Sequence, residues 1–598
     1  MRVPLRSAVI ALIAVAISCG TGSEPLNVVI IAVDTLRPDH LGCYGYERNT
    51  SPAIDNLAAE GVLLENTISQ SPWTLPSFST VFTSLYPSQH GAMSAVSRMR
   101  ETFPTLAAIL KEHGYATGAV VNATVLRPEY GVNRGFDYYD PPPSMGRRAD
   151  GVTADVLEWI QRHNDRPFLM FAHYFDPHEP YAPLPPYDAL FDAGYNGRIG
   201  NAFVLHDYFP NVVGMNFDDL RSLDEMDWDH IRALYDGEIA YTDKAIADLL
   251  SGLSDLGIRD NTLVVFLSDH GEEFFEHEGF GHGHTLFGEV IRVPLIFSLP
   301  DRLPEGMRVS RQVRLIDVMP TILSLLGIST DAHLEGIDLM PALTGNGETA
   351  PSRGALFPPG AAYSEGLLQG SERKGITAQP WKMIYDLRTR NEMLFNLEQD
   401  PAEEENLVVH KPEALALLEG MMFKSLFEMS DTWYIEMVGT AQEHTLDLKI
   451  TSERGPAIGN IPLFKFFDTS GRTLDVGQVL TSAEGHMVAV KGIQLEEPLT
   501  LAFIAEGPGA IPVNLDLRLD GKPAIENTYF GEKLKAPAQM PFALKSRPNT
   551  AQLRTGPSSR PEPPYFLIWH YESVYKGKTT TQLDEKIKGE LRALGYIQ

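Results

Sequence analysis

Two segments far apart in the chain place metal-binding side chains at the ends of apolar runs. Asn27–Thr35 reads NVVIIAVDT and contains Asp34, whereas Val264–Glu272 reads VVFLSDHGE and contains Asp269 and His270. Apolar runs of this length indicate buried strands of a parallel sheet, and ligands bind at the carboxyl ends of such strands. A helix N-cap role is the alternative for either Asp alone. Two such endings, one with a histidine attached, favour a metal site to which both segments contribute.

Strands and helices that alternate along the first half of the chain must bring these residues together. The pattern predicts a doubly wound, mostly parallel sheet in an α/β domain over residues 26–330. Its predicted strands lie at 28–33, 116–121, 167–173 and 264–268, and its predicted helices lie near 52–60, 106–113, 150–160 and from 231 onward. The stretch 182–228 is rich in Pro, Gly and aromatic residues and is predicted to be an insertion over the active-site face.

The second half of the chain changes character twice. Short strands around Trp381 and Met393 predict a small antiparallel C-terminal subdomain of the catalytic unit over 331–435. Residues 440–535 contain runs that alternate at period two between Gly and Pro turns, a pattern typical of an added β-sandwich domain. Residues 536–598 are predicted to be a linker that ends in a helix from Leu583 to Gly595.

The N-terminus is typical of an export signal. A short basic segment precedes the apolar run Ser7–Ile17, and Ser18 and Cys19 follow it. Such a run is too short to span a bilayer comfortably. The A-I-S-C sequence resembles a bacterial lipobox, so residues 1–19 predict lipidation of Cys19, with simple cleavage as the alternative. We therefore expect an extracytoplasmic protein, in the periplasm or at the outer membrane as a lipoprotein, or otherwise secreted. Only Cys43 remains, which excludes a disulfide framework.

Composition and charge restrict the partners. The 598 residues carry a formal net charge of −29, which argues against nucleic acid or an anionic membrane surface as the main partner. We expect membrane contact only through the N-terminal lipid. An anionic substrate must be attracted by local positive charge, either an arginine or a metal, against the overall field.

A segment between the two metal-type strands completes the pattern. Ser71–Gly91 reads SPWTLPSFSTVFTSLYPSQHG. With VDTLRPDHLG from Val33 and SDHGE from Ser268, it resembles the sulfatase family of the alkaline phosphatase superfamily, over residues 26–410. Further matching segments are FDPHEPY from Phe175, GHGHTLFGEVIRVP from Gly281, LIDVMPT from Leu315 and NLEQDPAEEENL from Asn396. The resemblance implies an alkaline-phosphatase-like sandwich that holds one or two divalent metals and acts on a sulfate or phosphate ester.

The chain departs from the family at the nucleophile. Sulfatases carry Cys or Ser in a C/S-x-P-x-R motif and convert it to formylglycine, whereas this chain aligns Thr74 with the nucleophile and Phe78 with the arginine. Oxidation of a threonine gives a ketone and not an aldehyde, so we expect no formylglycine. Phosphodiesterases and phosphotransferases of the superfamily use an unmodified threonine, and the resemblance implies the same here: a metal-bound Thr74 that forms a covalent phosphothreonine. A helix N-cap is the alternative role for Thr74.

The resemblance also assigns the remaining site residues. Asp34, Thr74, Asp269 and His270 form the implied metal shell, with Zn²⁺ or Mn²⁺ as the expected ion and Ca²⁺ or Mg²⁺ as alternatives. His178 and His282 match catalytic histidines and are the candidate ligands of a second metal. The candidate substrate-binding residues are Asn122, Arg37 and His284. For these the alternatives are a turn role for Asn122 and ion pairing for Arg37; His173, at the end of its predicted strand, is a further candidate.

The sequence leaves four functions open. The leading hypothesis is a metal-dependent hydrolase of a phosphodiester or phosphonate ester, whose anionic substrate is lipid- or glycan-linked. A sulfuric ester hydrolase is the first alternative, because fold does not fix substrate. A headgroup phosphotransferase and a non-catalytic binding protein that kept the fold are the others.

Overall fold

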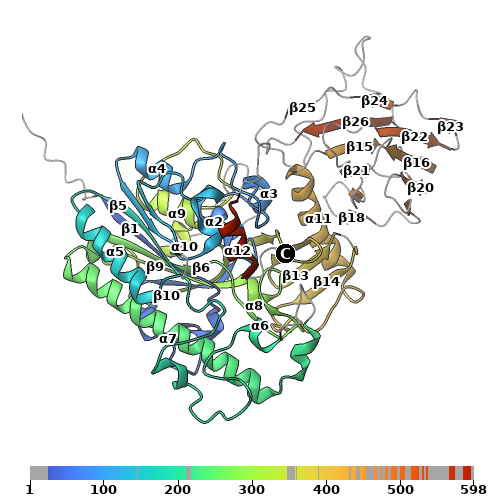
Figure 1. Cartoon of the computed structure of the whole chain (residues 1–598). Coiled ribbons are helices and arrows are strands. Elements are labelled where there is room, and N and C mark those ends of the chain that lie inside the picture. Colours follow the sequence, from blue (N-terminus) through green and yellow to red (C-terminus); the bar gives the residue numbers. More distant parts are fainter. Residues whose placement is uncertain are drawn as a thin grey trace, which may run out of the picture.

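The computed structural model describes the catalytic region almost completely (Figure 1). Residues 25–429 are described apart from 144–145, 210–216, 346–356, 358–359 and 388. Beyond them the structure describes the strands between 432 and 572, a few of their neighbouring residues and the segment 583–593. The predicted signal segment 1–19 lies outside the described residues.

An eight-stranded sheet is the centre of the catalytic region. Its strands follow the order β10-β2-β9-β6-β1-β5-β3-β4, and all neighbours pair in parallel except β9, which is antiparallel to both β2 and β6. The strands span β1 Asn27–Val33, β2 Val62–Ile68, β3 Ala116–Val120, β4 Tyr138–Asp140, β5 Phe168–Tyr174, β6 Thr262–Ser268, β9 Arg292–Ser298 and β10 Met307–Arg314. The predicted mostly parallel sheet is confirmed.

Helices cover both faces of this sheet (Figure 1). On one face lie α1 (Pro52–Ala59), α5 (Ala149–His163) and α7 (Glu225–Asp255). On the other lie α2 (Thr74–Thr83), α4 (Leu106–Glu112) and α9 (Val318–Leu325). Each face has its own apolar core, which explains why β1 and β6 are apolar at successive positions and do not alternate with polar ones.

The strand order determines where the functional side chains meet. β6, β1, β5 and β3 are consecutive neighbours and run in the same direction. Val33 pairs with Ser268 on one side, and Ala32 pairs with His173 on the other. Asp34, Asn122 and Asp269, which follow β1, β3 and β6, therefore emerge at one edge of the sheet. A ligand site of an open α/β fold is expected at this edge.

The insertion 182–228 packs on α7 through short elements. These are η5 (Tyr187–Ala189), α6 (Leu205–Tyr208) and η6 (Asp218–Ser222). The Tyr195 ring stacks on His230 of α7, with ring centroids 3.7 Å apart, and Phe217 contacts the predicted site residue His284, with centroids 5.4 Å apart. The insertion therefore reaches the loop that carries His282 and His284.

A four-stranded antiparallel sheet follows the central one, as predicted. It consists of β11 (Ala361–Ser364), β12 (Arg373–Ala378), β13 (Trp381–Asp386) and β14 (Glu392–Asn396), with α11 (Pro412–Met429) after it. Its connection to β12 touches the active-site loop, because the main-chain N–H groups of Leu368 and Gln369 both donate to the carbonyl of Gly283.

The described strands from Thr432 onward form two further sheets. One has the order β18-β17-β21-β15-β26-β24, with β25 paired to β26, and the other has the order β19-β20-β16-β22-β23. Besides β15 and β26, their strands span β16 Thr445–Ser452, β17 Phe464–Phe467, β18 Thr473–Leu474, β19 Val479–Thr481, β20 Met487–Gln494, β21 Leu499–Ile504, β22 Val513–Leu519, β23 Lys522–Pro523, β24 Thr528–Phe530 and β25 Leu534–Lys535. β26 (Tyr565–Glu572) falls in the stretch 536–598 predicted to be a linker, yet it pairs with β15 (Thr432–Val438) inside the first sheet. The terminal helix α12 spans Glu585–Ala593, close to its predicted bounds. No helix in the described part of the chain is long and apolar enough to cross a bilayer.

Candidate active site

Asp34, Asp269 and His270 converge at the end of the β1–β6 pair. Asp34 directly follows β1, and Asp269 and His270 directly follow β6. The His270 Nε2 atom lies 3.5 Å from Asp34 Oδ1 and 3.3 Å from Asp269 Oδ2. All three side chains are fully buried. The structure thus brings together three of the four predicted metal ligands from strands that are far apart in the sequence.

The two carboxylates are costly to bury without a cation. None of the four carboxylate oxygens of Asp34 and Asp269 has a hydrogen-bond partner among the described residues. Burial, and then the charge of Glu272, raises the pKa of Asp34 well above its ordinary value; burial and the charge of Asp34 do the same for Asp269. Unsatisfied buried carboxylates of this kind mark a site that a cation completes.

Thr74 is the fourth member of this cluster and the first residue of α2. Its Oγ1 atom lies 3.3 Å from His270 Nε2. The His270 Nδ1 atom faces the Gly271 carbonyl at 3.0 Å and must carry the ring proton. Nε2 is then unprotonated, as a metal-ligating histidine requires, and it accepts the hydrogen bond of the Thr74 hydroxyl. The helix start also directs main-chain N–H groups toward this point, which favours a bound anion.

These residues fit a divalent metal. Asp34, Asp269 and His270 each offer a ligand atom, and the three atoms lie within 4.8 Å of one another. Two carboxylates, an imidazole and a hydroxyl suit a hard or borderline cation. His178 and His282 belong to no such group of three in the described part of the chain. The geometry therefore fits a divalent cation held by Asp34, Asp269 and His270, with the Thr74 hydroxyl beside them.

Phe78 occupies the position one helical turn after Thr74. Its ring is completely buried and packs edge-on against Phe171, at 5.3 Å, and His173, at 5.2 Å between centroids. Residues four apart share one helix face, so the side chain here points to the sheet edge beside Asp34. An apolar ring thus fills the place that the sulfatase motif gives to arginine.

His178 and His282 face each other beside the cluster. Their ring centroids are 4.9 Å apart, and the His282 ring lies 4.4 Å from that of His270. His178 Nδ1 contacts the Glu179 carbonyl at 2.6 Å, and His282 Nδ1 contacts Glu272 Oε1 at 2.7 Å. Burial, and then the charge of a neighbouring histidine, lowers the pKa of His178 to about 4 and that of His282 to about 3. Both rings are therefore neutral in the absence of an anion.

Glu272 was missed as a candidate in the sequence. It is fully buried, and burial raises its pKa to about 7. It stands two residues after His270 in SDHGE, and the only sequence signal was an acidic residue directly beyond the metal-type strand ending.

The three predicted substrate-binding residues are engaged with the protein. The side chain of Asn122 pairs with the main chain of Arg147, accepting from its N–H at 3.0 Å and donating to its carbonyl. Arg37 donates to Asp39, Glu276 and the Glu272 carbonyl, which agrees with the alternative of a bracing role. His284 contacts Glu273 Oε2 through Nε2 at 2.8 Å.

Two histidine–glutamate pairs brace the loop between Asp269 and β9. Besides His284–Glu273, His277 Nδ1 lies 2.7 Å from Glu289 Oε1, and its ring stacks on Phe287. Glu273, His277 and Glu289 also form a group with metal-binding spacing. However, Glu273 Oε1 already accepts from the N–H groups of His277 and Gly279, so these contacts are explained by loop bracing alone.

We expect the His277–Glu289 pair to make a contribution to the free energy of unfolding that depends on pH. Burial lowers the pKa of His277, but the hydrogen bond and charge of Glu289 outweigh it and raise the value to about 9. The pair therefore stabilises the folded protein in full when the pH is below the ordinary pKa of histidine. This stabilisation is lost as the pH rises through about 9. We expect His277→Gln to lower the free energy of unfolding by roughly 1 to 3 kcal/mol below pH 6.5, and to have little effect well above pH 9. A difference that grows with pH would contradict this origin.

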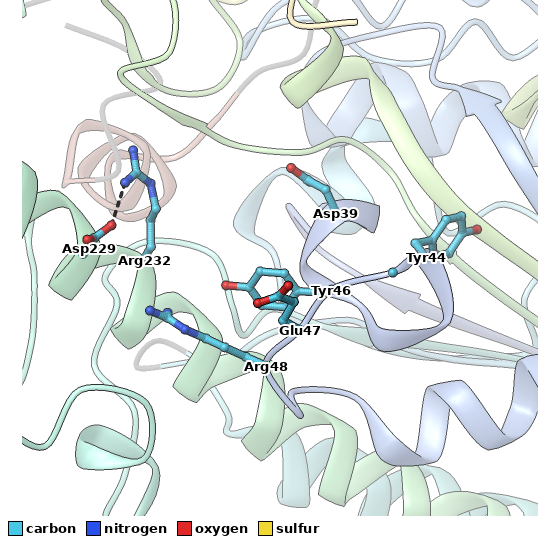
Figure 2. A pocket seen from close by; sticks show the side chains of 8 residues that line it. Asp39, Tyr44, Tyr46, Glu47, Arg48, Asp229 and Arg232 are labelled. Carbon is cyan, nitrogen blue, oxygen red and sulfur yellow. Dashed lines mark hydrogen bonds and ion pairs between the residues drawn. The ribbon is translucent and has the colours of Figure 1, made fainter.

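A separate pocket of about 440 Å³ opens near the loop after β1 (Figure 2). It is lined by Asp39, Tyr44, Gly45, Tyr46, Glu47, Arg48, Asp229 and Arg232. Arg48 and Tyr46 both donate to the buried Asp236 carboxylate, and Arg232 pairs with Asp229. None of the lining residues belongs to the cluster of Asp34, Thr74, Asp269 and His270, so this pocket is not the candidate active site.

Comparison with known families decides the classification. The sulfatase family profile, described as "Sulfatase", matches residues 26–328, which is more than half of the chain. The chain is a member of the sulfatase family. The profile described as "N-sulphoglucosamine sulphohydrolase, C-terminal" matches residues 276–431 of this sulfatase-family protein. It is accordingly a hydrolase that acts on sulfuric or phosphoric ester bonds, and members of this superfamily use a divalent metal.

Individual relatives of this sulfatase-family protein are distant. An N-acetylglucosamine-6-O-sulfatase of Bacteroides thetaiotaomicron is 22% identical over 465 residues, covering 64% of this chain and 82% of the relative. Arylsulfatase A of Homo sapiens is 25% identical over 497 residues, covering 71% of this chain and 93% of the relative. These two similarities leave the substrate of the present protein open.

Solved structures share the fold of this sulfatase-family protein. A structure in complex with its substrate D-glucosamine-2-N,6-O-disulfate aligns with a TM-score of 0.57 at 19% identity, over 67% of this chain and 98% of the other. A phosphonate monoester hydrolase of Agrobacterium radiobacter aligns with a TM-score of 0.54 at 22% identity, over 65% and 93%. The alkaline-phosphatase-like fold predicted from the sequence is thereby confirmed.

Proposed function

We propose that the protein hydrolyses an anionic phosphodiester or phosphonate ester, with the unmodified Thr74 hydroxyl as nucleophile. One observation carries the proposal: Thr74 lies in the cluster of buried metal ligands, and one helical turn later Phe78 fills the place of the sulfatase arginine. Asp34, Asp269 and His270 would hold a divalent cation, whose charge would make the Thr74 hydroxyl nucleophilic at neutral pH and neutralise the ester oxygens.

The protein residues perform the other parts of the reaction. The Thr74 hydroxyl loses its proton to solvent, and its Oγ1 forms a bond to phosphorus as the bond from phosphorus to the leaving oxygen breaks. Water then attacks the phosphothreonine, the Oγ1–phosphorus bond breaks, and Thr74 regains its proton. The N-terminus of α2 stabilises the phosphoryl charge next to Thr74. His178 and His282 border the place of the ester; a bound anion raises their pKa values, which enables either ring to give a proton to the leaving oxygen.

Hydrolysis of a sulfuric ester is the second candidate function. Family membership favours it, because the matched profiles and the relatives compared above carry sulfatase names. Thr74 and Phe78 favour the phosphorus ester, because neither residue of the pair that makes and supports formylglycine is present. The phosphonate monoester hydrolase shares the fold, so the fold itself is compatible with both substrates.

A comparison of two chromogenic esters tests the proposal. Protein loaded with Mn²⁺ or Zn²⁺ is assayed for kcat/KM on bis(p-nitrophenyl) phosphate and on p-nitrophenyl sulfate, which share a leaving group. We expect the phosphodiester to be preferred by at least about tenfold, or 1.4 kcal/mol in transition-state binding. A preference for the sulfate would overturn the proposal in favour of the second candidate.

An unmodified Thr74 predicts a specific mass. Trypsin cleaves after Arg48 and Arg98, so residue 74 lies in the peptide 49–98. We expect this peptide from active protein to have the mass of its unmodified sequence, with no loss of hydrogen at Thr74. Fragment spectra that place an oxidised residue at position 74 would contradict the proposed nucleophile.

We also propose that Cys19 anchors the protein to a membrane outside the cytoplasm. The lipobox-like A-I-S-C sequence supports this location. In a bacterial host with lipoprotein processing, we expect wild-type protein in the membrane fraction, and Cys19→Ser protein as a soluble or unprocessed form. Equal distribution of the two proteins would exclude the lipid anchor.

A further inference from the structure

His173 is a buried imidazole at the centre of the site that the proposed reaction does not use. It lies near the end of β5, which the sheet order places between β1 and β3. Its register partner is Ala32, two residues before Asp34. Because alternate residues of a strand point to the same face, His173 and Ala32 both point toward α2, the helix of Thr74 and Phe78.

The hydrogen bonds of the ring determine which nitrogen carries its proton. The main-chain N–H of Asn122, just after β3, lies 3.2 Å from His173 Nδ1. An N–H group can only donate, so Nδ1 accepts and the proton of the neutral ring is on Nε2.

The protonated nitrogen faces Asp34. His173 Nε2 lies 3.3 Å from Asp34 Oδ2, and both side chains are fully buried. Within the described residues neither atom has a hydrogen-bond partner, although both need one. An N–H group that lies next to a carboxylate oxygen in this way can hold one oxygen while the other is left for a cation.

Two phenylalanines keep the ring in this orientation. Phe78 packs edge-on against the imidazole, with centroids 5.2 Å apart at 83°, and Phe171 lies 6.1 Å away on the same strand. An arginine at position 78 would bring a charged group to the face where the neutral imidazole now lies. The phenylalanine and the histidine are thus complementary, and together they provide a donor to Asp34 without adding charge.

We propose that His173 is a positioning residue for the metal ligand Asp34, with Asn122 N–H fixing its tautomer and Phe78 its orientation. Its Nε2–H is the donor available to Asp34 Oδ2, and a hydrogen bond formed across this 3.3 Å contact would present Oδ1 to the metal that the proposed function requires. Outer-shell partners of this kind typically change metal affinity by about 10- to 100-fold when they are removed. In this arrangement Asn122 acts through its main chain and not through contact with substrate.

Metal affinity, measured without substrate, tests this role. Glutamine places its amide nitrogen near the position of histidine Nε2, and asparagine places it near that of Nδ1. Both variants keep a polar side chain, but only glutamine can replace the N–H donor that faces Asp34. We expect His173→Asn to raise the Mn²⁺ dissociation constant about 10- to 100-fold, and His173→Gln to restore most of the affinity. Tyr174→Phe is the matched control, because it removes a hydrogen bond to Thr153 on the other face of the same strand and we expect unchanged affinity.

The outcomes are distinct. Equal affinity in both His173 variants, or the same loss as in Tyr174→Phe, would overturn the positioning role, as would a wild-type protein that binds neither Mn²⁺ nor Zn²⁺. If His173→Asn does not fold, ¹⁵N NMR of the wild-type imidazole decides, since a proton on Nδ1 of His173 contradicts the assignment. A protein that binds metal normally but prefers sulfate esters would refute the proposed function and leave this inference intact.

Discussion

Thr74→Val is expected to abolish hydrolysis of bis(p-nitrophenyl) phosphate while leaving the protein folded. Valine retains the shape of threonine and lacks only the hydroxyl, whose oxygen lies 3.3 Å from His270 Nε2. Removal of a catalytic nucleophile lowers kcat by about 10⁴-fold or more in hydrolases where it has been measured by substitution. The measurement is kcat in metal-loaded protein, with thermal unfolding as a check on folding.

Thr74→Ser is the matched control for the same position. Serine keeps the hydroxyl and loses the methyl group, so most phosphodiesterase activity should remain. If Thr74→Val keeps substantial activity, another residue is the nucleophile. If the serine variant instead acquires sulfatase activity in a host that makes formylglycine, the motif alignment on Thr74 is correct and its threonine selects the chemistry.

Asp269→Asn is expected to lower the affinity for metal and to raise the stability of the metal-free protein. The neutral amide removes one of two adjacent buried carboxylates, so we expect metal affinity to fall by at least about 100-fold, the upper end of what outer-shell changes cost. In metal-free protein the same substitution should raise the melting temperature near pH 7, because it removes a carboxyl that burial and Asp34 make costly to ionise.

The pH dependence of this stabilisation has a defined sign. The folded-state pKa of Asp269 is raised, so below the unfolded value of about 3.9 the carboxyl is protonated in both states and costs nothing. The cost appears as pH rises above that value. We therefore expect the stability gain of Asp269→Asn in chelator to grow from pH 4 to pH 7, and added Mn²⁺ to stabilise only the wild type. A gain that is independent of pH would contradict this account.

The endings of the strands were predictable from the sequence. The apolar runs that precede Asp34 and Asp269 are buried at every position, because both faces of the sheet are covered by helices. A buried strand of this kind determines where the residue after it lies, at the carboxyl edge of the sheet. The predicted metal ligands converge for this reason. The helix start was predictable as well, but the alternative N-cap role for Thr74 is wrong, because Trp73 is the N-cap of α2 and Thr74 is its first residue.

Side-chain partners that depend on tertiary packing were not predictable. Asn122 has the right location for a substrate contact, but its amide is engaged by the main chain of Arg147, which no local pattern indicates. Glu276, one partner of Arg37, and Glu273, the partner of His284, likewise lie in a loop whose path the sequence does not define. β2 and the antiparallel β9 were not predicted, and β26 was missed because a Pro-rich stretch precedes it.

The position of β1 has a consequence for synthesis of the protein. β1 lies between β5 and β6, and its pairing partners Asn27 and Thr262 are 235 residues apart. Until β6 emerges from the ribosome, one edge of a strand that is apolar at every residue after Asn27 remains open to other chains. Pairing over such a separation is slow, and the exposed edge favours aggregation. A nascent chain stalled before residue 262 should therefore need chaperone protection, and it can acquire neither metal nor activity.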